Sequence, residues 1–352
     1  MDPVCHTLFG AALARAGLRR GTPLATATLL IGANLPDVDA VVYLASRPAL
    51  DLGFRRGWTH GIGALAVWPF VLTGVMLLWD RWVRRRVGTI PPPKLRPRRI
   101  LALAFVSVWS HPILDTLNTY GVRWLMPFSG RWFYGDTLFI VDPWVWLALA
   151  AGTYLAARQD RIRRHGARPV NAARVALALM LVYVLGMAGM NLAGRAVARR
   201  ELERGTGDTI RRLMAAPAPV SPFTRAVVAE GARAYYTGRV TWRPTPRFRL
   251  EERFPLPDTA GTAMRRALAA ASGRDFLRWA RFPLVQLDGA TGAVRLVDLR
   301  YARPGDPEGF GTLTIRPGDA PAGPVSPAGP APWPPTGNPG PDSGAARRAR
   351  AR

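Results

Sequence analysis

Uninterrupted runs of apolar residues in the first half of the chain predict helices that cross a membrane. Two runs, Gly61–Trp79 and Val175–Gly194, contain no charged residue. A helix needs about 20 predominantly apolar residues to span the hydrocarbon core of a bilayer, and both runs approach or reach that length. We predict that both are membrane-spanning helices.

Two further apolar runs are interrupted by polar residues. Leu138–Ala157 carries one acidic residue, Asp142, and Ile100–Asn118 contains His111 and Asp115. Polar side chains at such depth in a membrane are usually paired or functional, so both runs remain candidate spans. The four runs together predict a mainly α-helical, polytopic transmembrane bundle.

The start of the chain predicts a shorter element. Val4–Gly17 and Thr22–Pro36 are each short for a full span, and Arg19-Arg20-Gly21 separates them. Two short apolar segments joined by a polar turn are typical of a tight helical hairpin. The predicted bundle therefore has about four spans and a short N-terminal helical hairpin.

After Gly194 the pattern becomes that of a small soluble α+β domain. A charged helical stretch that can lie on the membrane surface continues to about Met214. Alternating apolar residues and turn dipeptides then predict strands at Val240–Trp242, Arg247–Phe254, Ala293–Ala302 and Gly311–Ile315, and helices at Thr259–Ser272 and Arg274–Arg281. From Asp319 onward Pro, Gly, Ala and Arg dominate, which predicts disorder. The predicted domains are 1–195, a transmembrane domain that carries the site motifs, 196–318, the soluble domain, and 319–352, a disordered tail.

Positive charge between the apolar runs predicts the orientation in the membrane. The segments Arg81–Arg99 and Arg158–Arg174 are both rich in arginine. Because such loops stay on the cytoplasmic side, the chain is predicted to be a multi-pass membrane protein with both segments in the cytoplasm. The soluble domain then lies outside the cytoplasm, although arginines that follow Gly194 oppose this orientation.

Composition changes this picture little. The chain has 48 Lys and Arg residues against 23 Asp and Glu, a net charge of +25, yet Lys94 is its only lysine. Its basic loops lack the interleaved aromatic residues of a nucleic-acid stacking surface, so we predict no specific nucleic-acid partner. The single cysteine, Cys5, excludes an intrachain disulfide and is interpreted as a buried thiol.

The histidines carry the candidate chemistry. Three of the four, His6, His60 and His111, sit in compact polar motifs at the edges of apolar runs, whereas His165 lies in an arginine-rich loop and is interpreted as solvated. The motif of His111 continues to Asp115, one helical turn away on the same face. A second acidic motif, Asn34-Leu-Pro-Asp37-Val-Asp39, follows the hairpin.

These residues predict a metal site near the outer membrane face. The proposed ligands are His6, Asp37, Asp39, His60, His111 and Asp115. Imidazole combined with carboxylate favours a divalent metal, zinc above iron or manganese, over magnesium or calcium. Taken singly, each residue is more simply a capping or loop residue; the set as a whole favours a site, because the predicted topology places its members near one face.

Other polar residues of the same motifs are predicted to support the ligands or contact a substrate: Asn34, Arg56, Thr59, Asn118 and Tyr120. Arg55, Arg56 and Arg123 are close enough in sequence to bind an anionic group, although arginines at membrane edges more often contact lipid headgroups.

At these motifs the sequence resembles the YdjM-type membrane-bound metal-dependent hydrolases of bacterial inner membranes. The matching segments are His6-Thr-Leu, Asn34 to Asp39, Arg56-Gly-Trp-Thr-His60 and Ser110 to Gly121, within about residues 1–200. The resemblance implies a multi-span helical body and a divalent metal site of a kind likened to zinc-dependent phospholipase C. His6, Asp37, Asp39, His60, His111 and Asp115 all match the motif positions.

Two functions from different classes follow. The first is a metal-dependent hydrolase acting on a phosphoester or lipid-linked substrate, in which the metal activates water and Asp37 or Asp39 serves as base. The alternative is a non-enzymatic envelope protein whose His and Asp cluster is a structural staple and whose soluble domain binds a partner. Nucleic-acid binding through the basic loops is a weaker third.

Overall fold

The computed structural model describes residues 1–40, 54–84, 93–163, 170–256 and 261–319. The chain divides into two compact units. The first, which we call the helical unit, comprises Met1–Leu44, Arg55–Leu192 and Ala216–Pro222; the second, the sheet unit, comprises Ala45–Phe54, Ala193–Ala215 and Phe223–Arg352. The predicted limits at 195 and 318 stay predictions, and His165 and the tail beyond Asp319 lie outside the described residues.

The chain begins with the hairpin that its sequence indicates. Helix α1 (Pro3–Leu13) starts at Asp2, whose carboxylate accepts hydrogen bonds from the backbone amides of the first turn. A π-helical turn (Ala14–Leu18) with Gly17 at φ 134° reverses the chain before α2 (Ala25–Gly32). A Cβ atom on Gly10 would lie 2.7 Å from the carbonyl oxygen of Leu29, so glycine permits the close approach of α1 and α2.

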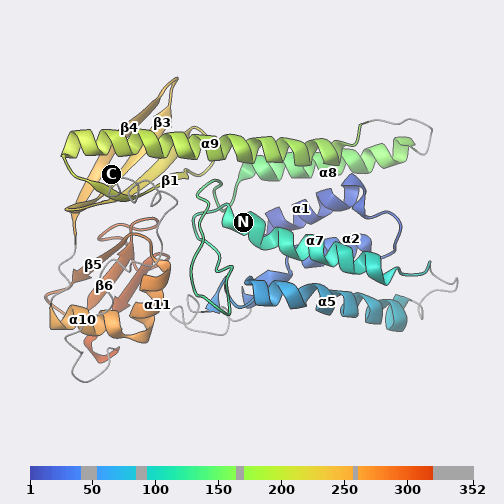
Figure 1. Ribbon diagram of the computed structural model, residues 1–352, viewed down its shortest axis with the longest axis horizontal. Coiled ribbons are helices and arrows are strands. Elements are labelled where there is room, and N and C mark those ends of the chain that lie inside the picture. Colours follow the sequence, from blue (N-terminus) through green and yellow to red (C-terminus); the bar gives the residue numbers. More distant parts are fainter. Residues whose placement is uncertain (41–53, 85–92, 164–169, 257–260, 320–352) are drawn as a thin grey trace, which may run out of the picture. The chain divides into compact units, whose positions relative to one another are not determined.

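Longer helices form the body of the helical unit. They are α5 (Ile62–Trp79, extended by a π-helical turn Asp80–Arg84), α7 (Pro97–Thr116), α8 (Pro143–Arg163) and α9 (Ala172–Thr206). Helix α7 packs against both α2 and α5, and α8 packs against α1 (Figure 1). Buried Leu65, Leu72, Ile100 and Val108 fill the space between α5 and α7. Helix α7 is therefore the central element to which the hairpin and α5 attach.

The prediction of about four spans is wrong. Among the described residues only Ile62–Arg84 and Ala172–Thr206 are long and apolar enough to cross a membrane. Helix α7 carries arginines in its first turn and His111 and Asp115 near its end. Helix α8 begins only at Pro143, because Asp142 caps it through the backbone amides of Trp144 and Val145. The first residues of the apolar run, from Leu138 to Asp142, therefore lie outside the helix.

The sheet unit contains two antiparallel sheets. The first has the order β1 (Ile210–Pro217), β2 (Thr224–Gly231), β3 (Ala234–Trp242), β4 (Pro246–Pro255), and the second β5 (Pro283–Leu287), β6 (Val294–Asp298), β7 (Thr312–Ile315). Helices α10 (Thr262–Ala269) and α11 (Ala271–Trp279) lie between them in the chain. The end of α9 packs on the first sheet through Ala198 and Leu202, which share a core with Tyr236 and Val240.

The sheets differ from expectation in two respects. The helical stretch predicted to reach Met214 ends at Thr206, because Gly207 takes φ 60° and stops the helix, and the chain enters β1 instead. The segments predicted as strands contribute to β3, β4, β6 and β7, whereas β1, β2 and β5 were not anticipated. Buried Asp208, between α9 and β1, helps to fix the path of the chain here. Its carboxylate accepts hydrogen bonds from the Ala232 and Arg233 amides and from the Tyr236 hydroxyl.

The α2–α7 crossing tolerates no larger residue at Gly32. An added Cβ there would overlap the Ser107 hydroxyl oxygen, which itself bonds to the carbonyl of Leu103. We expect Gly32→Val to cost about 1 to 3 kcal/mol by overpacking, seen as a lower Tm of the detergent-solubilised protein. Gly186→Val is the matched control, because nothing lies within 4 Å of a Cβ at Gly186. Equal Tm values for the two variants would contradict this packing.

Candidate metal centre

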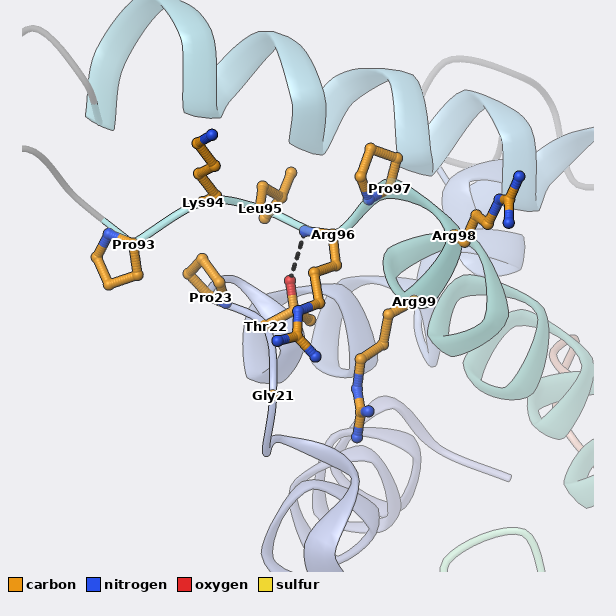
Figure 2. Close-up of a pocket in the computed structure, with 10 residues that line it drawn as sticks. All are labelled: Gly21, Thr22, Pro23, Pro93, Lys94, Leu95, Arg96, Pro97, Arg98 and Arg99. Carbon is orange, nitrogen blue, oxygen red and sulfur yellow. Dashed lines mark hydrogen bonds between the residues drawn. The ribbon is translucent and has the colours of Figure 1, made fainter.

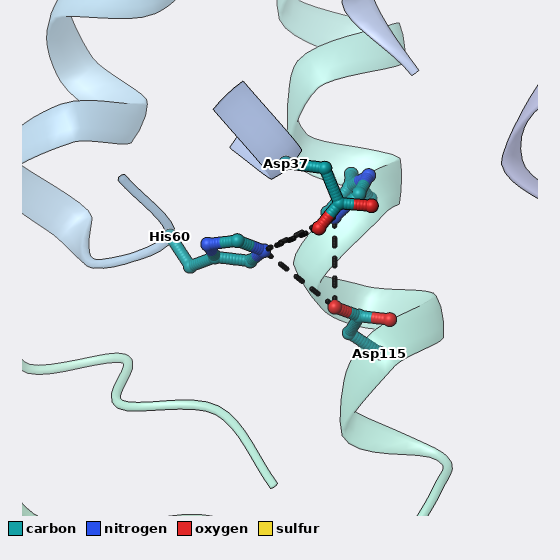
Figure 3. A group of neighbouring side chains, drawn as sticks. Asp37, His60 and Asp115 are labelled. Atoms are coloured by element: carbon teal, nitrogen blue, oxygen red, sulfur yellow. Dashed lines mark hydrogen bonds and ion pairs between the residues drawn. The ribbon is translucent and has the colours of Figure 1, made fainter. Parts of the chain in front are cut away.

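Four polar side chains from three separate segments converge inside the helical unit. One ligand atom each from Asp37, His60, His111 and Asp115 lies within 4.8 Å of the other three. His60, His111 and Asp115 are completely buried, while the Asp37 side chain is 25% exposed. Figure 3 shows Asp37, His60 and Asp115 pointing toward one another.

Local structure explains how each ligand reaches this point. His111 and Asp115 lie one turn apart on α7, so both project from the same face. Asp37 belongs to the 3₁₀ turn Leu35–Asp39 that follows α2, where Pro36 favours the first turn. His60 ends a tight turn just before α5, with its amide donating to the carbonyl of Gly57 at 3.2 Å.

The hydrogen-bond network fixes which imidazole nitrogen carries the proton. His111 Nδ1 lies 2.7 Å from the Ala33 carbonyl oxygen, which can only accept, so this nitrogen donates. The Thr59 hydroxyl donates to Asp39 at 3.1 Å and therefore accepts from His60 Nδ1 at 2.9 Å. In its neutral form each imidazole therefore presents an unprotonated Nε2, and these two atoms face each other at 3.1 Å.

In the neutral forms of His60 and His111, this arrangement places two electron-pair donors against one another. Burial lowers the pKa of His60 to about 3, so that imidazole stays neutral near pH 7. Burial raises the pKa of the Asp39 carboxyl, and the hydrogen bond from the Arg56 amide opposes that rise. Because the facing lone pairs repel, a cation between them would relieve the repulsion.

The separations fit a tetrahedral ion. Ligand atoms about 2.0 to 2.2 Å from a tetrahedral zinc ion lie about 3.4 Å from one another. His60 Nε2 lies 3.6 Å from both Asp37 Oδ1 and Asp115 Oδ2. His111 Nε2 lies 3.4 Å from Asp37 Oδ1 and 3.5 Å from Asp115 Oδ2. The four side chains therefore can hold a metal ion in their present conformations.

Arg56 contacts both carboxylate oxygens of Asp115, including the oxygen that faces His60 and His111. Its Nε and Nη2 atoms each lie 3.2 Å from one carboxylate oxygen of Asp115, and Nη1 donates to Asn118 at 3.2 Å. Its backbone has φ 48°, a conformation unfavourable for arginine, and its amide donates to Asp39 at 2.9 Å. The Tyr120 ring covers the guanidinium at 4.7 Å. Arg56 is buried and bound to Asp115, so its position favours a supporting role over contact with an anionic substrate.

The remaining predicted residues lie around the four-atom group. His6 stacks on His111 at 3.8 Å between ring centroids, and its Nε2 lies 3.3 Å from Asp115 Oδ1. Asp39 contacts Thr59 and the Arg56 amide. Asn34 donates instead to the Thr7 hydroxyl, at 3.1 Å. The structure thus places His6 and Asp39 beside the ligand atoms, outside the group of four.

A cavity of about 480 Å³ reaches Asp37, the most accessible of the four ligands. Its other lining residues are Thr7, Leu30, Ile31, Asn34, Leu35 and Val38. The Thr7–Asn34 pair supplies the polar part of this wall, and the α2 and 3₁₀ side chains supply the apolar part. The cavity therefore offers a route to the centre that is largely apolar.

Comparison with known proteins assigns the helical unit to a family. Residues 1–193, more than half of the chain, match the model of the YdjM inner membrane protein family. The chain belongs to the YdjM family. It is also similar to the uncharacterized protein YfhP of Bacillus subtilis strain 168, at 23% identity over 278 residues, covering 78% of this chain and 77% of that protein. No solved structure matches.

Two contacts in this YdjM family protein escaped sequence reasoning. The carbonyl of Ala33 sets the His111 tautomer, and the backbone nitrogen of Met1 contacts Asp115. Both contacts use main-chain atoms. Every residue type has these atoms, so the sequence does not reveal the contacts. The position of Ala33 beside the recognisable Asn34-Leu-Pro-Asp37 motif is the one signal that points to it.

We expect the purified full-length protein to retain zinc, and His60→Ala with His111→Ala to lose it, because the two imidazoles supply half of the ligand atoms. Elemental analysis of protein in detergent measures the content. His165→Ala is a control of the same residue type outside the ligand group. Equal zinc in wild type and the double variant would show that the side chains do not hold a metal.

Asp39→Asn tests the relay through Thr59. The substitution weakens the acceptor that orients the Thr59 hydroxyl and, through it, His60. Loss of such a supporting partner typically weakens metal affinity about 10- to 100-fold. Competition with a chelator measures the affinity, with Asp275→Asn in the sheet unit as control. An unchanged affinity for Asp39→Asn would mean that the relay does not tune the site.

Proposed function

We propose that this protein is a metal-dependent hydrolase of the inner membrane that acts on a phosphoester in an amphiphilic, lipid-linked substrate. The observation that carries the proposal is the buried pair of Nε2 atoms, from His60 and His111, which lie 3.1 Å apart and are flanked by two carboxylates at 3.4 to 3.6 Å. Such a donor set suits a Lewis-acidic ion.

Zinc suits the donor set best, with iron and manganese as alternatives. Two imidazoles and two carboxylates at tetrahedral spacing are ordinary zinc ligands, whereas magnesium and calcium prefer shells of oxygen alone. Three carboxylates, those of Asp37, Asp39 and Asp115, face two basic groups, the Arg56 guanidinium and the Met1 amino group, so carboxylate is in excess where a cation would bind. When bound, such an ion supplies Lewis acidity and lowers the pKa of water.

The protein's own residues position the ligands and supply a candidate base. Ala33 and Thr59 hold the two imidazoles in the tautomer that presents Nε2. Arg56 holds Asp115, and the complete burial of that carboxylate excludes bulk water from this side. If His60, His111 and Asp115 hold the ion, its fourth position is open to water, and Asp37, which faces the cavity, can then accept a proton from that water. Asp39 is placed less well as a base, because its carboxylate is buried against Thr59 and the Arg56 amide.

The cavity suggests the substrate class. Its apolar wall of Leu30, Ile31, Leu35 and Val38 suits hydrocarbon, and the Thr7–Asn34 pair can bond to a polar headgroup next to Asp37. Ile31 and Val38 are more than 40% exposed, which is expected where a wall continues toward lipid. An amphiphile would thus enter with its chains along this wall and its ester at Asp37.

Position in the membrane supports the outer face as the place of reaction. His60 immediately precedes α5, a candidate span, while the basic segment after Arg81 follows the other end of that helix. Because positive loops stay in the cytoplasm, the centre would lie toward the outside. We extend this orientation to the sheet unit, which would then be extracytoplasmic.

A structural role for the cluster is the competing function. Asp115 bonds to Arg56 and His6 as well as lying against the imidazoles, so it ties α1, α7 and the segment before α5 together. In that case Asp115→Asn would lower the Tm in detergent, and phosphoester hydrolysis by the wild type would stay at background with zinc bound.

Hydrolysis of a phosphodiester tests the proposed activity. We expect zinc-loaded protein in mixed micelles to cleave bis(p-nitrophenyl) phosphate slowly and a phospholipid headgroup faster, because the cavity wall binds hydrocarbon. Asp37→Asn should reduce kcat at least about 100-fold, the usual contribution of a positioned base, and His165→Ala should not. Activity of Asp37→Asn equal to wild type would refute the role of Asp37, and background rates for both substrates would refute the hydrolase.

A further inference from the structure

A second cavity, of about 1200 Å³, lies at the opposite end of α7 from the metal centre. Its lining residues are Gly21, Thr22, Pro23 and the segment Pro93–Arg99 (Figure 2). Fourteen residues separate Pro97, where α7 begins, from His111, so the two sites are about 20 Å apart along the helix. The cavity is therefore a separate feature of the helical unit.

Four cations line this cavity without a matching anion. They are Lys94, Arg96, Arg98 and Arg99. Nearby arginines are compensated: Arg15 and Arg19 pair with Asp160, and Arg84 pairs with Asp80. Within the part of the chain that the structure describes, no carboxylate pairs with any of the four. The first turn of α7 also lacks an acidic residue and a capping side chain, so its positive end adds to the same field.

Two of the four cations are arranged to act together. In Figure 2 Arg96 and Arg99 run from the start of α7 in the same direction, beside Thr22 and Gly21, whereas Lys94 and Arg98 project away from them. Gly21 has φ 85°, and a Cβ there would lie 3.1 Å from the Arg99 guanidinium, so the absence of a side chain leaves room for Arg99.

Thr22 adds a hydroxyl to this pair of guanidinium groups. The side chain is 7% exposed, and its oxygen accepts from the Arg96 backbone amide at 3.0 Å. The hydroxyl proton has no acceptor among the described residues and remains available to a ligand. Two forked donors and one hydroxyl suit the oxygens of a phosphate group.

The cavity lies beside the end of a candidate span. Arg84, the last residue of the candidate span Ile62–Arg84, donates from Nη2 to the carbonyl of Pro93 at 2.8 Å, and Pro93 lines the cavity. Groups at the end of a span meet the headgroup layer, where anionic lipids attract clustered arginine and lysine. A phosphate can thus reach the cavity from a lipid or from solution.

We propose that this cavity binds a phosphate group, held by Arg96, Arg99 and Thr22, as a site distinct from the metal centre. The proposal does not depend on the hydrolase function, because it rests on none of the metal-site residues. An occupant would bridge the start of α7 to the turn before α2, and so fasten the central helix to the hairpin.

Native mass spectrometry of the full-length protein, released from neutral detergent, tests the site. The probes are dihexanoyl-phosphatidylglycerol, dihexanoyl-phosphatidylcholine and inorganic phosphate. We expect retained phosphatidylglycerol on wild type and about 100-fold weaker binding to Arg96→Gln with Arg99→Gln, the scale of two lost charge-assisted contacts. Lys94→Gln with Arg98→Gln removes the same charge from the same segment and should weaken binding far less.

The probes separate the two sources of phosphate. Competition by inorganic phosphate would support a free-phosphate ligand, and retention of phosphatidylglycerol that phosphate does not displace would support a lipid headgroup. Arg96→Lys with Arg99→Lys keeps the charge but removes the forks, and should still bind about tenfold more weakly. An unchanged Tm in each variant shows that the fold is kept. Equal loss in the two Gln variants, or no loss in either, would overturn the proposal.

Discussion

The contact on which the centre depends is the pair of Nε2 atoms of His60 and His111, 3.1 Å apart in a buried space. The Nδ1 atom of His111 donates to the Ala33 carbonyl, and the Nδ1 atom of His60 donates to the Thr59 hydroxyl. Lone pairs brought this close would repel in the absence of a cation. The surrounding structure, from the 3₁₀ turn to the Arg56 guanidinium, holds the side chains in place against that repulsion.

Helix α7 holds two of the buried polar residues of this centre, His111 and Asp115. Apart from Ser107 at the crossing with α2, its face toward α2 and α5 is apolar up to Val108 and then changes to His111 and Asp115. A buried carboxylate is stable only with several partners, and Asp115 obtains them from Arg56 and His6, which lie on other segments. The same polar residues explain why α7 is long enough to cross a bilayer but not apolar enough.

The helical unit is therefore polar at both ends of its central helix, for different reasons. Toward the end of α7 the charges are largely buried and paired with one another around Asp115. At the start of α7 the cations of Pro93–Arg99 are exposed and have no partner among the described residues. One end is built to gather a cation and the other to attract an anion, and the apolar packing of α2, α5 and α7 separates them.

The sequence by itself determined the two uninterrupted apolar helices, the hairpin, several strands and the identity of the candidate ligands. Those inferences follow from local periodicity and from residue types whose chemistry is narrow. The tertiary structure decided how His6 and Asp39 stand apart from the four converging ligand atoms, how Arg56 is bound to Asp115, and which tautomer each imidazole adopts. It also decided that α8 starts at Asp142 and that α9 gives way to β1. These outcomes depend on main-chain carbonyls, caps and close approaches between distant segments, which the order of residues does not display.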